Sequence, residues 1–407
     1  MEKAKSTKLG ARIWVSILFF GLAGQLAWVI ENMYFNVYLF DAVGGTANDI
    51  AAMVAASAVT AALTTLIMGA LSDKLGKRKV FITVGYIIWG IVTASFGFIT
   101  VGNTEKLFHS ANAVATASLI IIVMDWVMQA LPLLAILVVF GLLDGYKQRG
   151  EWKTFFLIVG ITTTVVGVLG LFFLKDKPGI KANNENYFKN IIYGFKPSTV
   201  KANKMLYVAF AAFCIFNIAY QVFMPYLIIY LEKTLGIENY AIPLGAILVV
   251  SAVVSVLLGG VIDKVGKVKF LLPAAIILTA GFVLMYFVNG ENMALLIIIG
   301  IIMMSAFLVT SAAVCGTIRD YTPNDKVGLF QGVRMVFQVL IPMITGPYIG
   351  AAVIANNNQT YEELGVVKTI PTPNIFLAAA AVAVFSLIPI AVLLHSRRKA
   401  QAEDTEK

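Results

Sequence analysis

The chain has 407 residues, of which 59% are hydrophobic and 13% are charged, and its formal net charge is +9. A soluble globular domain carries roughly 25% charged residues, so this chain is too poor in charge to cover its surface in water. It contains two cysteines and two histidines. This count excludes a disulfide framework and most histidine-based catalysis or metal chemistry.

Eleven apolar runs follow one another along the chain. A membrane-spanning helix needs about 20 residues, so 407 residues allow roughly ten to twelve spans with short loops. The first run is too long for a signal-peptide core, and we read it as a retained span. The runs cover residues 13–40, 48–71, 79–101, 113–143, 154–174, 205–231, 241–262, 268–289, 293–317, 328–354 and 372–394.

The longest polar segment, 175–204, contains seven lysines and divides the chain into two halves. Basic residues concentrate in cytoplasmic loops, so this segment is a predicted cytoplasmic linker, and the basic residues near both termini place these inside as well. We predict an all-α integral membrane protein of the plasma (inner) membrane. Its parts are an N-terminal helical bundle (1–174), the linker (175–204), a C-terminal bundle (205–395) and a cytoplasmic tail (396–407).

The two halves share a loop motif, G-x-x-x-D-K-x-G-K-x-K, which we expect to act in gating. Its first glycine is expected to let helices approach closely, and its aspartate to accept hydrogen bonds at a helix N-terminus. One copy alone could be an ordinary basic loop, but two copies 190 residues apart indicate an internal repeat. The motif residues are Gly69, Asp73, Gly76 and Lys77, and then Gly259, Asp263, Gly266 and Lys267.

The first spans of the halves also match, at an offset of 192 residues. Parallel repeats of this kind are typical of one large class of transporters. The matching residues are Gln25, Ala27, Trp28, Tyr34, Tyr38 and Leu39 in the first half, and Asn217, Ala219, Tyr220, Tyr226, Tyr230 and Leu231 in the second.

On these loops the sequence resembles the major facilitator superfamily. Within it, the chain is similar to the glycoside–pentoside–hexuronide cation symporters and their sucrose-transporter relatives, through the segment 122–125 with its Asp125 and through the loop 319–328. The resemblance implies two pseudo-symmetric six-helix bundles, a central cavity and alternating access. It implies a secondary active transporter of a small solute, a sugar, with no cofactor beyond a coupling proton or sodium ion. Its partners would be that solute and the lipid bilayer, and no nucleic acid.

The second helix departs from the sodium-coupled members of that branch, which carry carboxylates there. This chain has Ser57, Thr60, Thr64 and Thr65 instead, and Gln25 stands where a first-helix carboxylate is common. Proton coupling, sodium coupling and facilitated transport therefore stay open.

Two intramembrane carboxylates are candidates for function, because inserting each costs about 2.5–3.5 kcal/mol. Glu31 could carry a proton or pair near the outer surface, and Asp125 could bind sugar hydroxyls or a cation. Arg334 follows Lys326 closely and is expected to anchor a cytoplasmic helix end rather than to bind the solute.

Polar and aromatic residues on the first spans of both halves are expected to line the solute pathway, or else to make interhelical hydrogen bonds. They are Gln25, Trp28, Asn32 and Tyr34, with Asn217, Tyr220, Gln221 and Tyr226.

The run 113–143 is one apolar stretch where the second half has two spans and a polar loop. We predict a twelve-helix plan with a shortened helix 4–5 region, bent or re-entrant around Gln129–Pro132. The shortening leaves an alternative open, a non-transporting paralogue or sensor. An enzyme is not expected, because the sequence has no H-E-x-x-H pair and no phosphate-binding loop.

Overall fold

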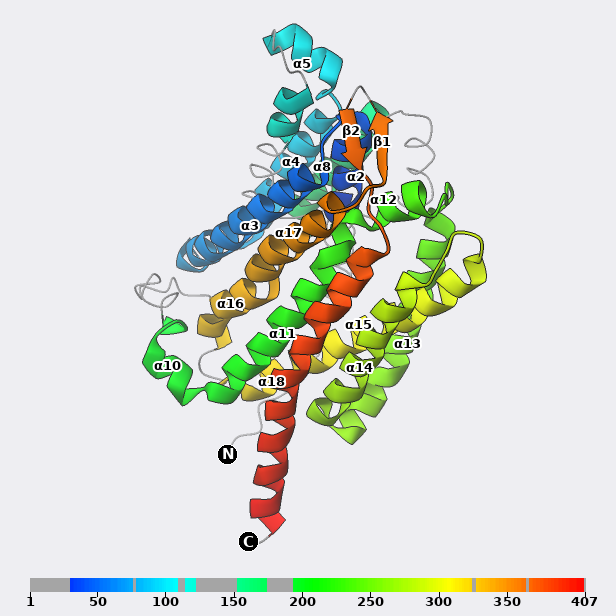
Figure 1. Ribbon diagram of the computed structural model, residues 1–407. Coiled ribbons are helices and arrows are strands. Elements are labelled where there is room, and N and C mark those ends of the chain that lie inside the picture. Colours follow the sequence, from blue (N-terminus) through cyan, green and yellow to red (C-terminus); the bar gives the residue numbers. More distant parts are fainter. Residues whose placement is uncertain are drawn as a thin grey trace. The chain divides into compact units, whose positions relative to one another are not determined.

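The computed structural model describes residues 30–75, 78–108, 114–121, 152–173, 193–323, 327–363 and 366–405, and most of them are helical (Figure 1). The chain forms two compact units. One consists of Met1–Phe35 with Leu63–Glu185, and the other of Asn36–Ala62 with Asn186–Lys407. Residues 36–62, which the sequence assigns to the first bundle, thus belong to the second unit, and the predicted domain boundaries stay a prediction.

Eight helices in the described ranges are long and apolar enough to cross a membrane, or nine if one bent pair counts as a span. Six of them follow one another without interruption in the second half, as the repeat predicts. These six are Lys204–Thr234, Ala241–Ile262, Lys267–Tyr286, Met293–Tyr321, Phe330–Ala355 and Asn374–Lys399. The all-α membrane architecture predicted from the apolar runs is therefore confirmed.

The described part of the first half begins with π-helical turns at Ile30–Tyr34 and Tyr38–Ala42, which flank the short α2 (Phe35–Val37). The long helices are α3 (Ala47–Leu75), α4 (Arg78–Phe96) and α8 (Trp152–Phe173). A shorter helix, α5 (Val101–Phe108), follows α4 after a bend of 92° between Thr83–Phe96 and Val101–Leu107. Residues 114–121 are also helical.

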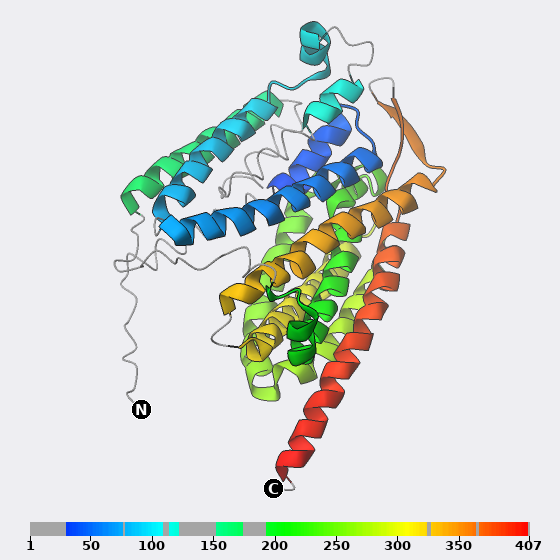
Figure 2. The same cartoon turned by 90° about the vertical axis from the view of Figure 1, so that its left-hand side faces the viewer.

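Helices α4 and α8 lie side by side along their lengths (Figure 2), and glycines set their spacing. A Cβ atom at Gly90 of α4 would lie 2.5 Å from the backbone nitrogen of Thr164, and one at Gly160 of α8 would lie 2.5 Å from that of Ala94. Small residues allow this backbone contact, which supplies the packing that helices need in lipid. The pair is thereby held in a fixed register.

The second half begins with α10 (Pro197–Ala202), followed by α11 (Lys204–Phe223), a 3₁₀ turn (Met224–Tyr226), α12 (Leu227–Ile229) and a π-helical turn (Tyr230–Thr234). Next come α13 (Ala241–Val265), α14 (Lys267–Tyr286) and α15 (Met293–Tyr321). Then α16 (Val327–Met335) leads through a π-helical turn (Val336–Leu340) into α17 (Ile341–Ala355). A β-hairpin, β1 (Thr360–Glu363) and β2 (Val366–Thr369), precedes α18 (Asn374–Thr405).

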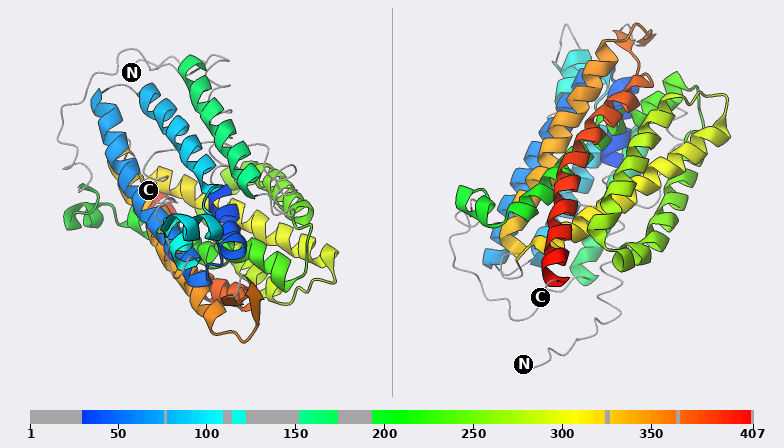
Figure 3. Two further views of the ribbon diagram at one scale, coloured as in Figure 1. Left: turned by 90° about the horizontal axis from the view of Figure 1, so that it is seen from above. Right: turned by 60° about the horizontal axis from the view of Figure 1, so that its bottom comes forward.

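The hairpin is antiparallel, with Thr360 opposite Thr369 and Glu363 opposite Val366. It lies between the end of α17 and the start of α18 (Figure 3, right). We call the end of the second-half helices that carries it the hairpin end. The opposite end, where α13 meets α14 at Gly266, is the motif end.

Helix α11 packs against both α17 and α18, while α15 packs against α13 and α14. The approach of α17 to α11 depends on two glycines in a G-x-x-x-G arrangement. A Cβ atom at Gly346 would lie 2.5 Å from the Cβ of Gln221, and one at Gly350 would lie 2.2 Å from the carbonyl oxygen of Val222. These contacts bring α17 against the residues of α11 that the sequence assigns to the pathway.

The shortened helix 4–5 region is described only at 114–121. The predicted bend around Gln129–Pro132 lies outside the described residues and stays a prediction.

Candidate functional site

The internal repeat reappears in the backbone where the first helix of each half ends. Two π-helical turns, Tyr38–Ala42 and Tyr230–Thr234, are separated by the 192-residue offset of the sequence repeat. The short helices α2 and α12 that precede them are separated by the same offset. Since π-helical turns are rare and often mark functional sites, their duplication indicates a shared role.

The turns that follow these helix ends also repeat. Gly44 and Gly236 both have positive φ, at 91° and 68°. The amide of Gly45 donates to the carbonyl of Leu39, and the amide of Ile237 donates to that of Leu231, at 2.8 and 2.9 Å. Glycine is needed at both turns because positive φ is unfavourable for residues with a Cβ atom.

An ion pair joins equivalent positions of the two repeats. Asp41 and Lys233 stand 192 residues apart, and Lys233 Nζ lies 3.4 Å from Asp41 Oδ1. Both side chains are largely buried, with 14% and 24% of their surface exposed. Lys233 also lies 5.1 Å from the ring centroid of Tyr361 on β1, so the hairpin takes part in the same contact.

A buried lysine fastens the hairpin to the end of the first helix. Lys368 of β2 is 2% exposed and donates a hydrogen bond to the carbonyl oxygen of Phe40. Its ammonium lies 4.6 Å from the ring centroid of Phe40 and 5.8 Å from that of Tyr361. The sequence reading missed this residue, because a lysine in a loop is ordinarily exposed. We call Phe40, Asp41, Lys233, Tyr361 and Lys368 the hairpin-end cluster.

Tyr226 lies fully buried near this cluster and connects three segments. Its hydroxyl lies 2.8 Å from the carbonyl oxygen of Pro347 in α17 and 3.2 Å from that of Ala47 at the start of α3. The alternative left open by the sequence, an interhelical hydrogen bond, therefore holds for this hydroxyl.

The other predicted pathway residues lie in the last two turns of α11, near the middle of the span Lys204–Thr234. Tyr220 stacks on Phe307 of α15, with ring centroids 4.1 Å apart, and the amide nitrogen of Asn217 donates to the carbonyl of Phe213 at 2.8 Å. Gln221 is 5% exposed, and its side-chain oxygen has no hydrogen-bond partner among the described residues. Buried polar atoms are normally paired, so this unpaired oxygen is a candidate solute contact, and the ring of the adjacent Tyr220 is a second one.

Fewer of the predicted first-half residues are described. Asn32 is buried, and Tyr34 is buried with its ring centroid 5.4 Å from that of Phe155. Glu31 lies in the first π-helical turn. Gln25, Trp28 and Asp125 lie outside the described residues.

The motif loops are described in part. In the first half, α3 contains Gly69 and Asp73, while Gly76 and Lys77 lie outside the described residues. In the second half, α13 contains Gly259 and Asp263, and Gly266 separates α13 from α14.

Gly259 does not have the packing role predicted for it. No described atom lies within 4 Å of a Cβ atom built there, so no helix among the described residues of this unit packs against this glycine. The motif position whose backbone conformation requires glycine is Gly266, where φ is 101°. Glycine tolerates this value without the steric cost that other residues incur.

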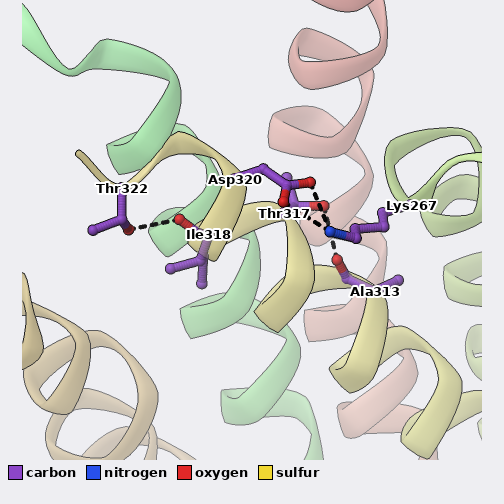
Figure 4. A network of polar contacts seen from close by, with 6 residues as sticks. All are labelled: Lys267, Ala313, Thr317, Ile318, Asp320 and Thr322. Atoms are coloured by element: carbon purple, nitrogen blue, oxygen red, sulfur yellow. Dashed lines mark hydrogen bonds and ion pairs between the residues drawn. The ribbon is translucent and has the colours of Figure 1, made fainter. Parts of the chain in front are cut away.

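Lys267 of the motif pairs with Asp320 at the end of α15 (Figure 4). Its Nζ lies 2.8 Å from both carboxylate oxygens. The stem of the lysine crosses Gly316, where a Cβ atom would lie 2.8 Å from the lysine Cδ. Because Asp320 is 57% exposed, the pair contributes less than about 1 kcal/mol and mainly orients the helix ends.

Arg334 does not behave as the helix-end anchor that its position suggested. Its Nε lies 2.8 Å from Gln338 Oε1, and its Nη2 lies 3.4 Å from the sulfur of Cys315 in α15. The guanidinium is thus held against a neighbouring helix at membrane depth.

These features define a multi-pass, all-α membrane protein built from two repeated halves. The sequence matches the Major Facilitator Superfamily over residues 127–315 and 244–407, which together exceed half of the chain. The chain belongs to this superfamily, and it is therefore a membrane transporter of small solutes rather than an enzyme.

Solved structures of transporters share the fold. A mutant of the nucleoside transporter NupG aligns with a TM-score of 0.71 and 12% identity, covering 94% of this chain and 100% of that one. The unmutated NupG structure aligns with a TM-score of 0.61, 11% identity and coverages of 95% and 99%. The xylose transporter XylE from E. coli, partially occluded and inward open, aligns with a TM-score of 0.55, 13% identity and coverages of 88% and 92%. No curated protein matches the sequence significantly.

Proposed function

We propose that this chain is a secondary transporter of a sugar, or of a solute with similar hydroxyl groups, and that it works by alternating access. The observations that carry the proposal concern Tyr220 and Gln221, which lie near the middle of the span Lys204–Thr234 and which we call the mid-depth set. The side-chain oxygen of Gln221 has no hydrogen-bond partner among the described residues, and its sequence neighbour Tyr220 stacks on Phe307. Sugars are bound by planar hydrogen-bonding groups and by rings stacked on their apolar faces. NupG and XylE, whose solutes contain sugar rings, are consistent with this class.

The hairpin-end cluster would close the pathway on the outer side of the plasma membrane. The motif loops and both termini would lie on the cytoplasmic side. Opening that side requires Asp41 to leave Lys233, and Phe40 to leave Lys368. Both contacts are strong enough to hold a closed state and weak enough to break during a transport cycle.

Coupling to a proton or to sodium remains part of the proposal. Asp125, which lies in an apolar run of the sequence, is the candidate carrier, since ionisable residues within membrane spans are costly and commonly mark ion pathways. Glu31 is the second candidate.

The test is uptake of labelled mono- and disaccharides into vesicles that hold the purified protein, with and without a proton or sodium gradient. Gradient-driven uptake of one sugar that is lost in Asp125→Asn supports a coupled symporter. Uptake whose rate does not depend on either gradient supports facilitated transport. Protein that is shown to be folded and takes up no sugar contradicts the proposal, and favours a non-transporting paralogue.

A further inference from the structure

We propose that Arg334 forms a subsite for an oxyanion, so that the transported solute carries a carboxylate or a phosphate besides its hydroxyl groups. This inference rests on the proposed transport function and specifies its solute. The subsite consists of Arg334, its partner Gln338 and the neighbouring Cys315.

The depth of this group places it within the membrane-spanning part of the second half. Arg334 stands seven residues after the start of α16, and Cys315 stands six residues before the end of α15. At 1.5 Å per residue, both lie about 9–10 Å from the motif end of their helices. A charged side chain at such depth is costly, and it almost always faces the bundle interior or a water-filled cavity.

The guanidinium is oriented rather than extended toward the helix end. Gln338, one turn further along, accepts from Nε at 2.8 Å, and Cys315 of the adjacent α15 accepts from Nη2 at 3.4 Å. A long arginine that served as an anchor would instead extend toward the lipid headgroups. Two partners on different helices fix the plane of the group, as recognition of a planar oxyanion requires.

The guanidinium also retains free binding capacity. An arginine carries five N–H groups, and within the described part of the chain two of them have partners. Three donors are left on a group that is only half buried. Two parallel N–H groups suffice for a bidentate contact with a carboxylate or phosphate, the geometry that arginine favours.

The neighbouring residues fit a polar group that passes along a pathway. Phe337, in the π-helical turn after α16, stacks on Phe210 of α11, with ring centroids 5.7 Å apart. Phe210 stands ten residues before Tyr220 and eleven before Gln221, so the subsite lies about 15–17 Å along α11 from the mid-depth set. Because no carboxylate contacts Arg334 in the described residues, a solute oxyanion could be the counter-charge.

Cys315 provides a direct reporter of this subsite, because the sequence has only one other cysteine, the buried Cys214. In a Cys214→Ala background, the alkylation of Cys315 by N-ethylmaleimide is followed by mass spectrometry. Glucuronate and glucose 6-phosphate are compared with glucose and with glucuronamide, a neutral analogue of glucuronate, at matched millimolar concentrations.

We expect glucuronate, glucose 6-phosphate or both to slow alkylation, and neither neutral sugar to do so. The concentration needed for protection should rise about tenfold to a hundredfold in Arg334→Gln, the loss expected for one charge-assisted hydrogen bond. Arg334→Lys should recover part of the affinity that Arg334→Gln loses. The comparison of glucuronate with glucuronamide needs no variant, so a variant that fails to fold does not weaken the test.

Equal protection by charged and neutral sugars, or none by either anion, overturns the proposal. So does slowing that appears only in vesicles containing phosphatidylglycerol, which assigns the subsite to a lipid headgroup. Uptake of neutral sugars without anion protection would refute the oxyanion subsite while leaving sugar transport intact. Anion protection without uptake of any sugar would support the oxyanion subsite and contradict sugar transport.

Discussion

Exchanging the charges of Asp41 and Lys233 tests whether their contact holds the hairpin end closed. The variants are Asp41→Asn, Lys233→Gln, and the exchange of Asp41→Lys combined with Lys233→Asp. Because the two residues occupy equivalent positions of the repeat, each receives a backbone that already accommodates the other. The exchange variant therefore restores the attraction between the two charges on an equivalent backbone.

The expected size follows from the geometry. At 3.4 Å and an effective dielectric constant of about 20, the attraction alone is about 5 kcal/mol. Desolvation and side-chain ordering offset most of it, and partly exposed pairs retain about 1 kcal/mol. That value corresponds to roughly a fivefold change in the ratio of open to closed forms.

The assay uses a cysteine at a buried position six residues after Asp41. Ala47 is 7% exposed, and its carbonyl, which Tyr226 contacts, is kept in Ala47→Cys. In a background with Cys214→Ala and Cys315→Ala, alkylation of this cysteine by a membrane-impermeant maleimide reports opening. The rate should rise about fivefold in either single variant and fall back toward the parent rate in the exchange. If the alkylation rates of both single variants stay within twofold of the parent rate, the ion pair does not hold the hairpin end closed. The same conclusion follows if the exchange variant is alkylated as fast as the single variants.

Two further changes address packing and the hairpin. Gly350→Ala should cost about 1–3 kcal/mol and lower the midpoint of thermal unfolding in detergent, because its Cβ would lie 2.2 Å from the carbonyl of Val222. Gly245→Ala, where no described atom lies within 4 Å of the Cβ, is the matched control, and equal midpoints would contradict the close-contact argument. Lys368→Met should speed hydrogen exchange of the hairpin amides by removing a charged hydrogen bond of about 1.5–3 kcal/mol. The exposed Lys264→Met should leave exchange unchanged, and equal effects of the two would show that Lys368 does not hold the hairpin.

Much of the second half could be predicted from the sequence. The apolar run 241–262 coincides with a span of the structure, because about 20 apolar residues in lipid can only be a helix or part of a closed barrel. The repeat was visible as well, since the duplicated residues stand at nearly the same offset, 190 residues for the loop motif and 192 for the first spans. Duplicated π-helical turns and positive-φ glycines then followed in the structure.

The residues that tie the hairpin end together could not be predicted. Lys368 lies in a polar loop, and its burial comes from Phe40, which is 328 residues away in sequence. No local pattern encodes such a contact. Gly259 shows the opposite error, because a motif glycine was assigned a packing partner that the described structure does not supply.

The opposite charges of Asp41 and Lys233 have a consequence for how the chain could be assembled. Two copies of the first half alone would bring one aspartate against another at this point, and two copies of the second half would oppose two lysines. Like charges facing each other are unfavourable, whereas the covalent pair is attractive. Although the two helix ends share a backbone conformation, their charges make them complementary and not interchangeable, so a self-paired half would lack the ion pair that the full chain forms.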